Sequence, residues 1–219
     1  MKIFTTIDGS DTIYSEEFNE VYHSRNGAIQ ESQHVFIKNG FNFSTKDDIK
    51  IFEVGFGTGL NALLTMLESE LKNISVDYTT VELLPLDIEV VKSLNYTTRL
   101  GYEFCYGPYH TLHLCRWNEI HQINNLFSFH KLNKSLFDCS LPDGYFDLIY
   151  FDAFDPENQP EMWTSDVFLK LYTAMSAGGI LVTYCSKSSV QKTLKSVGFV
   201  VEKLRGPAGK REMLRARKE

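Results

Sequence analysis

The sequence has no long apolar run, and it therefore predicts no membrane-spanning helix. Such a helix needs about 20 consecutive apolar residues, and no stretch of the 219 residues approaches that length. The start of the chain, MKIFTTIDGSDT, carries one lysine and no apolar core, so we expect no secretory signal and a cytoplasmic protein. With 43% hydrophobic and 23% charged residues, the composition is typical of one folded domain with a substantial core.

Cysteine is scarce, and no two cysteines form a Cys-x-x-Cys pair. The four are Cys105, Cys115, Cys139 and Cys185. This spacing argues against a zinc site and against a disulfide framework. We therefore expect no bound metal, cysteines that fill space as small apolar groups, and a reducing compartment.

The positive net charge that is typical of nucleic-acid-binding proteins is also missing, because the formal charge is −6. The charge is unevenly distributed, however. Residues 187–219 hold ten Lys and Arg against three Glu, a local charge of +7, which leaves −13 for residues 1–186. Ten cations in this segment are enough for several phosphate contacts, although the same run also fits a solvated surface.

Internal repeats are absent, and from residue 50 onward strand patterns alternate with helix patterns. Strands are predicted at 51–56, 75–83, 127–132, 146–151, 180–185, 199–204 and 212–216, and helices at 60–71, 85–94, 166–177 and 189–197. The third of these helices is expected to stop at Gly178-Gly179. Residues 97–126 show no clear pattern. Alternating strands and helices predict a mostly parallel sheet covered on both faces, with a ligand at the carboxyl ends of its strands.

The first 48 residues differ from the rest of the chain. Residues 12–24 predict a strand or hairpin, and residues 27–38 a short helix that ends at Asn39-Gly40. We expect this segment to be an extension packed on a catalytic domain formed by residues 49–219.

The stretch IFEVGFGTGLNALLT, residues 51–65, places three glycines between a strand and a helix. Glycines at such a turn let a ligand approach the main chain, and the amino end of the helix favours an anion. A dinucleotide fingerprint requires Gly-x-Gly-x-x-Gly, but Leu60 occupies the position of its third glycine. The pattern therefore indicates a nucleoside ligand and argues against a dinucleotide.

Acidic residues on both sides of this turn narrow the choice of ligand. Glu53 would repel a pyrophosphate, but it suits a ligand with an amino group or a positive centre, and S-adenosylmethionine has both. Glu82 ends the second predicted strand, where a carboxylate can accept both ribose hydroxyls. Asp138 follows the third predicted strand and is either a partner of the adenine amino group or an ordinary loop acid.

The segment FDLIYFDAFDPENQPEMW, residues 146–163, carries the best candidate for catalysis. Asp152 follows a buried strand and should face the same crevice as the glycine turn. An acceptor at this place would orient an attacking amine and take up charge as the ammonium forms; a loop-capping role is the alternative. Phe154 and Trp163 would wall the crevice, stack on a base or pack in the core.

Five pieces of the sequence, in order along nearly the whole chain, resemble one known family. They are GAIQESQHVFIKNG, EVGFGTGLN, FDAFDPENQPEMW, GGILVTYC and GKREML. The family is the methyltransferase half of the bifunctional tRNA 5-methylaminomethyl-2-thiouridine biosynthesis proteins (MnmC). The resemblance implies a Rossmann-like α/β fold with a seven-strand, mostly parallel sheet whose last strand is antiparallel. It also implies S-adenosylmethionine-dependent methyl transfer to the aminomethyl group of the tRNA wobble uridine.

The resemblance also implies where the site lies. The residues implied around the cofactor are Glu53, Gly55, Gly57, Gly59, Asn61 and Glu82, with Asp152 beside the acceptor amine. Glu31 and Ser32 fall on a Glu-Thr pair of the family, here with Ser for Thr, and are candidates for substrate binding. Lys210 and Arg211 precede the last strand and would contact phosphates of the anticodon loop.

Aromatic residues of the first segment offer a further contact with RNA. Splayed anticodon bases stack on aromatic planes, and Tyr14, Tyr22 and His23 are candidates for this role or for core packing.

One departure from the family is the flavin-dependent oxidoreductase half, for which 219 residues leave no room. We therefore expect the aminomethyl precursor to come from another enzyme or to be made directly. Three other readings stay open. They are a small-molecule amine methyltransferase or aminopropyltransferase, a binding module that has lost its chemistry, and, least favoured because of Leu60, a nicotinamide oxidoreductase.

Overall fold

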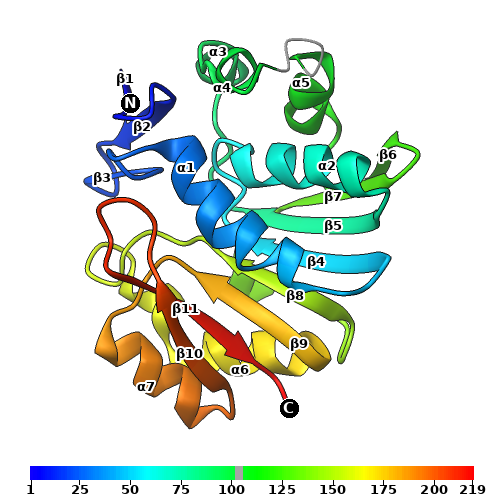
Figure 1. Cartoon of the computed structure of the whole chain (residues 1–219), viewed down its shortest axis with the longest axis vertical. Helices are drawn as coiled ribbons and strands as arrows, with labels where there is room; N and C mark the ends of the chain where they lie inside the picture. The colour runs from blue at the N-terminus through cyan, green and yellow to red at the C-terminus, as the bar shows by residue number, and fades with distance from the viewer. Residues whose placement is uncertain (102–105) are drawn as a thin grey trace.

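A central eight-stranded sheet organises the protein, seen here in a computed structural model that describes residues 1–101 and 106–219 (Figure 1). The strand order is β10-β11-β9-β8-β4-β5-β7-β6. The strands are β4 (Asp48–Val54), β5 (Ser75–Glu82), β6 (Ile120–Asn124), β7 (Phe127–Asn133), β8 (Phe146–Phe151), β9 (Met175–Thr183), β10 (Val200–Arg205) and β11 (Glu212–Arg217). The five central strands are parallel, whereas β11 runs antiparallel to both of its neighbours and β6 antiparallel to β7.

This arrangement confirms the predicted fold class and adds one strand. Seven strands are those of the expected sheet, with the last strand antiparallel. The eighth, β6, comes from residues 97–126, which showed no pattern. That strand lies at the edge of the sheet and buries neither of its faces fully, so no alternation of apolar residues is required. The same region holds α4 (Tyr96–Arg99) and α5 (Tyr106–Leu114).

Helices cover both faces of the sheet (Figure 1). One face carries α2 (Leu60–Lys72) and the π-helix η1 (Gln33–Lys38), and the other carries α6 (Ser165–Ala174) and α7 (Ser188–Ser196). Neighbouring residues of β4 belong to different cores: Ile51 packs on the α2 side, and Phe52 packs on the α6 side. Strand alternation thus sends every second side chain to each face.

Two helix boundaries differ from the prediction. The helix predicted at 166–177 ends at Ala174, and Gly178-Gly179 lies inside β9. The pairing of β8 with β9 shifts register there, so the glycines form a bulge instead of a helix terminus. The helix predicted from residue 85 begins only at α3 (Ile88–Lys92), where the side chain of Asp87 accepts a hydrogen bond from the Glu89 N–H at 2.7 Å.

The amino-terminal segment contains the predicted hairpin and helix. Strands β1 (Lys2–Thr5), β2 (Asp11–Ser15) and β3 (Glu20–Val21) form a small antiparallel sheet, and α1 (Ala28–Ser32) runs directly into η1. The 3-10 helix η2 (Phe41–Phe43) follows. The small sheet lies beside α1 in Figure 1.

No helix among the described residues is long and apolar enough to cross a membrane. Cys115, Cys139 and Cys185 are free thiols, the last two buried. Cys105 lies outside the described residues.

Candidate active site

Three acids reach the same end and the same face of the sheet. Glu53 lies in β4, between Thr80 of β5 and Tyr150 of β8 in the strand register. Glu82 and Asp152 each lie two residues further along those neighbouring strands. Because side chains alternate along a strand, all three acids point to the α2 side of the sheet.

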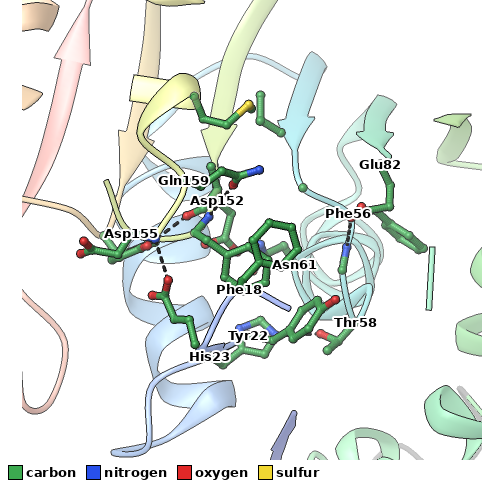
Figure 2. Close-up of a pocket in the computed structure, with 18 of the residues that line it drawn as sticks. Phe18, Tyr22, His23, Phe56, Thr58, Asn61, Glu82, Asp152, Asp155 and Gln159 are labelled. Carbon is green, nitrogen blue, oxygen red and sulfur yellow. Dashed lines mark hydrogen bonds between the residues drawn. The ribbon is translucent and has the colours of Figure 1, made fainter. Parts of the chain in front are cut away.

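A cavity of about 470 Å³ opens at this end of the sheet (Figure 2). Its wall is formed by the carboxyl ends of β4, β5 and β8, the glycine turn and residues of the amino-terminal segment. Asp152 and Glu82 lie on opposite sides of the space in Figure 2, with Asn61 between them. Its volume falls in the range of about 300–1,000 Å³ that is usual for small-molecule sites.

Asn61 links two of the acids. Its Nδ2 donates to Glu53 Oε1 at 3.1 Å and to Asp152 Oδ2 at 2.8 Å. Asn61 lies on the cavity wall, whereas Glu53 is fully buried and is absent from the lining. The structure thus places Glu53 behind Asn61, and only two of the three predicted acids face the cavity directly.

Burial changes the protonation of both carboxyls. Desolvation raises the pKa of Glu53 to about 8, and the charge of Asp152 acts in the same direction. Desolvation also raises the pKa of Asp152 to about 7, while the hydrogen bond from Asn61 works against that rise. Asp152 therefore titrates near neutral pH, which suits a group that handles a proton or an ammonium.

Glu82 is held by backbone groups at the other side of the cavity. Its Oε2 accepts from the Gly57 N–H at 3.0 Å, and its Oε1 accepts from the Leu84 N–H at 2.9 Å. Burial raises the pKa of Glu82, and these N–H groups partly offset that rise. A carboxylate fixed in this way keeps free lone pairs for a diol.

The glycine turn serves chain packing as well as ligand approach. At Gly55, which has a φ of 89°, an added Cβ would lie 2.8 Å from the carbonyl oxygen of Asp152. Glycine there lets the end of β4 lie directly against the residue that follows β8. Gly55 and Gly57 line the cavity, whereas Gly59 lies behind it as the N-cap of α2.

An ion pair closes the side of the cavity nearest Asp152. Lys210 Nζ lies 2.6 Å from Glu31 Oε1 and 3.8 Å from the ring centre of Tyr184. Glu31 Oε2 also accepts from the Ser24 N–H at 2.7 Å, so the acid is held from two directions. Ser32 is fully buried and does not reach the cavity.

Aromatic side chains form the wall after β8. Phe154 stacks on Phe18 with ring centres 4.4 Å apart and meets Tyr22 edge-on at 5.1 Å. Trp163, on the 3-10 helix η5 (Pro160–Trp163), donates from Nε1 to the Phe154 carbonyl at 2.7 Å. Trp163 is buried against Phe151 and does not line the cavity, so it supports Phe154 from behind.

Two other predicted residues stand outside the wall. Asp138 ends the 3-10 helix η4 (Leu136–Asp138) and is exposed, while Leu136 and Phe137 line the cavity. Arg211 is also exposed and does not line the cavity, unlike its neighbour Lys210.

Sequence reasoning missed how the amino-terminal segment covers the site. His23 Nε2 and Thr58 Oγ1 share a hydrogen bond of 2.7 Å that ties this segment to the glycine turn. Burial lowers the pKa of His23 to about 4, so the ring is neutral at physiological pH. Glu20 accepts from the Asp155 N–H at 2.9 Å. These contacts join residues far apart in the chain, so local sequence patterns do not predict them.

The side chains that line the cavity suit a nucleoside with a charged tail better than they suit a metal ion. Among residues 1–101 and 106–219, no group of three or more His, Cys, Asp or Glu side chains is placed to hold a metal ion. One part of the cavity wall is apolar and includes Leu83, Leu84 and Phe137. The other part is polar, with Asp152 and the glycine turn. The fully buried Glu53 Oε2 has no hydrogen-bond partner in the part of the chain that the structure describes, although the nearby hydroxyls of Tyr78 and Thr80 lower the pKa of Glu53.

Comparisons with known proteins agree with this site. A family model described as an S-adenosyl-L-methionine-dependent methyltransferase matches residues 122–219. The tRNA 5-methylaminomethyl-2-thiouridine biosynthesis bifunctional protein MnmC of Nitrosospira multiformis is 34% identical over 218 residues, which cover 92% of this chain and 34% of that protein. The MnmC of Leptospira interrogans is 33% identical over 223 residues, covering 93% and 33%. The chain thus spans about a third of the length of these curated relatives.

Two solved structures are similar to this chain in fold. The crystal structure of MnmC2 from Aquifex aeolicus matches with a TM-score of 0.77 and 25% identity, covering 98% of this chain and 69% of that one. Spermidine synthase from Thermotoga maritima matches with a TM-score of 0.57 and 14% identity, covering 96% and 69%, a likeness of fold alone.

The fold, the cavity and the family model agree on one class, that of the S-adenosyl-L-methionine-dependent methyltransferases. Within that class, the chain is similar to MnmC proteins over more than nine-tenths of its length.

Proposed function

We propose that the chain methylates the amine of 5-aminomethyluridine, or its 2-thio form, at the wobble position of tRNA. The observation that carries the proposal is the position of Asp152 on the cavity wall, where its Oδ2 accepts from Asn61 at 2.8 Å and burial raises its pKa to about 7. The similarity to MnmC over more than nine-tenths of the chain supports this substrate.

The cofactor side of the cavity contains Glu82 and the glycine turn. Glu82 would accept hydrogen bonds from the ribose hydroxyls, and the backbone around Gly55 and Gly57 would admit the amino-acid tail. Asn61 would meet the tail on the cavity wall. Asp138 would reach the adenine amino group from just outside the wall. When bound, S-adenosylmethionine supplies an activated methyl group on a sulfonium centre.

The acceptor side of the cavity is built around Asp152. Its carboxylate would accept a hydrogen bond from the amine, orient the nitrogen lone pair and stabilise the ammonium that forms. Lys210 and Glu31 border the same space, and Phe154 offers a ring for stacking the base. Ser32 and Trp163 would act indirectly, by holding Glu31 and Phe154 in place.

The amino-terminal extension, residues 1–48, would complete this acceptor side of the catalytic domain, residues 49–219. Phe18, Tyr22 and His23 already form part of the cavity wall.

The anticodon loop would lie over the rim near the turn that joins β10 and β11. Arg211 is exposed there and available to a phosphate. Half of the ten Lys and Arg residues in 187–219 already form ion pairs with acids of this chain. They are Lys187, Lys203, Lys210, Arg215 and Arg217. Phosphate binding would therefore depend on a few cations at this rim.

Labelled methyl transfer to tRNA tests the proposal. Bulk tRNA from cells that lack this protein is incubated with the purified chain and methyl-labelled cofactor, and the nucleosides are then separated. We expect label in 5-methylaminomethyluridine or its 2-thio form. Label only in a small-molecule amine, added in parallel, would contradict the proposal.

A further inference from the structure

The position of Glu53 differs from that expected of a cofactor ligand. Glu53 is fully buried, and the Asn61 amide stands between it and the cavity. Glu53 and Asp152 each bind the same nitrogen, so they are the two acceptors for the two hydrogens of one amide. The hydrogen bond to Asn61 therefore links an acid in this position to the cavity wall.

Two ionised carboxylates on one neutral amide, away from water, would be strongly unfavourable. Such a pair keeps a proton over a wide pH range, and the more deeply buried member is the one that holds it. Glu53 is that member, since it is fully buried whereas Asp152 lies on the cavity wall, and desolvation raises the pKa of Glu53. Within residues 1–101 and 106–219, Oε2 of Glu53 has no hydrogen-bond partner, and we place the proton on this oxygen.

We propose that Glu53 and Asn61 are positioning residues for Asp152: neutral Glu53 accepts from one amide hydrogen and so directs the other at the Asp152 carboxylate. The inference rests on the proposed function, in which Asp152 receives the acceptor amine. It also replaces the prediction from sequence that ionised Glu53 faces the cationic part of the cofactor.

The other titratable groups near Glu53 and Asp152 do not replace Asn61 as the donor that positions Asp152. Glu31 and Glu20 raise the pKa of Asp152, and Lys210 lowers it, but Lys210 and Glu31 are paired with each other. Around Glu53 and Asp152 stand Tyr78, Tyr150 and Tyr184, whose pKa values are raised by burial, so they stay neutral. Asn61 is the neutral donor that touches both acids.

Exchange of Glu53 for its neutral isostere gives the sharpest test. Glu53→Gln retains an oxygen that accepts from Asn61, so calorimetry should show a cofactor dissociation constant within about threefold of the unmodified protein. The matched comparison is Glu82→Gln, the same carboxyl-to-amide change on the cavity wall, which should weaken binding about tenfold or more. Equal losses in the two variants would overturn the proposal, because Glu53 would then be an ionised ligand.

Infrared difference spectroscopy reads the proton directly. At pH 7 the spectrum of the unmodified protein minus that of Glu53→Gln should show the carbonyl band of a neutral carboxylic acid, because the subtraction isolates Glu53 from Asp152. This measurement needs neither RNA nor turnover. A spectrum without that band would rule out the neutral acid.

The pH profile of Asn61→Ala separates positioning from a general structural role. Loss of the Asn61 donor should raise the pKa of Asp152, so the acidic limb of kcat should move up by about one pH unit. Part of the rate that is lost at pH 7 should then return at pH 9. An even loss at every pH would contradict the proposal.

The two proposals fail in different ways. If the proposed function is wrong, no variant and not even the unmodified protein methylates the tRNA, yet calorimetry and infrared spectra still report on Glu53. If only the positioning role is wrong, tRNA is methylated, and Glu53→Gln loses cofactor affinity.

Discussion

Asn61 and Asp152 meet at 2.8 Å across the top of the sheet, although 91 positions separate them in the chain. One lies at the start of α2 and the other directly after β8. In the proposed function, their contact joins the cofactor side of the cavity to its acceptor side, and Asn61 is held in turn by buried Glu53.

The first prediction concerns Glu82, which we assign to the ribose. Glu82→Ala should raise the cofactor dissociation constant about tenfold or more, because it removes a charged acceptor that the backbone holds in place. Titration calorimetry measures this change. Glu89→Ala is a suitable control, since Glu89 is exposed on α3 and forms an ion pair with Lys92. An unaltered constant in Glu82→Ala would remove the ribose assignment.

The second prediction concerns the stability of the free protein. Burial raises the pKa of Glu53 in the folded state to about 8, against an ordinary value of 4.5. Between these values the folded state keeps a proton that the unfolded state has lost, so the free energy of unfolding should fall as pH rises through this window. Glu53→Gln should remove that part of the fall, and urea unfolding should then favour the variant at pH 8 by more than about 1 kcal/mol relative to pH 5. Parallel pH curves for the two proteins would contradict the assignment.

The third prediction concerns Lys210, whose charge lowers the pKa of Asp152. Lys210→Ala removes that cation and leaves Glu31 unpaired, so both changes should raise the pKa of Asp152. The acidic limb of the pH–rate profile should therefore move to higher pH, while cofactor affinity changes little. Lys195→Ala, an exposed lysine on α7, serves as the control for charge alone. An acidic limb that does not move would mean that Lys210 acts only at the RNA surface.

Much of the fold followed from the sequence because strand alternation and glycine turns are local signals. The period of two along β4, β5 and β8 was enough to send Glu53, Glu82 and Asp152 to one face. The depth at which each acid lies relative to the cavity was not predictable from this alternation. Whether Glu53 lines the cavity or lies behind it depends on how α2 seats Asn61 against the sheet, and that is a matter of tertiary packing.

The amino-terminal cover of the site escaped prediction for a related reason. His23 contacts Thr58, and Glu20 contacts Asp155, through side chains that carry no periodic signal. Strand β6, within residues 97–126, gave no pattern because it is an exposed edge strand. The loop positions of Asp138 and Arg211 likewise depend on turns that place a neighbour, Phe137 or Lys210, on the cavity wall instead.

The role of Asp152 is tested most directly by Asp152→Asn, measured for cofactor binding and for methyl transfer in the same preparation. Asparagine keeps the size of the side chain but cannot take up the developing positive charge on the amine. We expect a cofactor dissociation constant within about threefold of the unmodified protein and a loss of turnover of about 100-fold or more. Turnover equal to that of the unmodified protein, with the cofactor bound, would contradict the account.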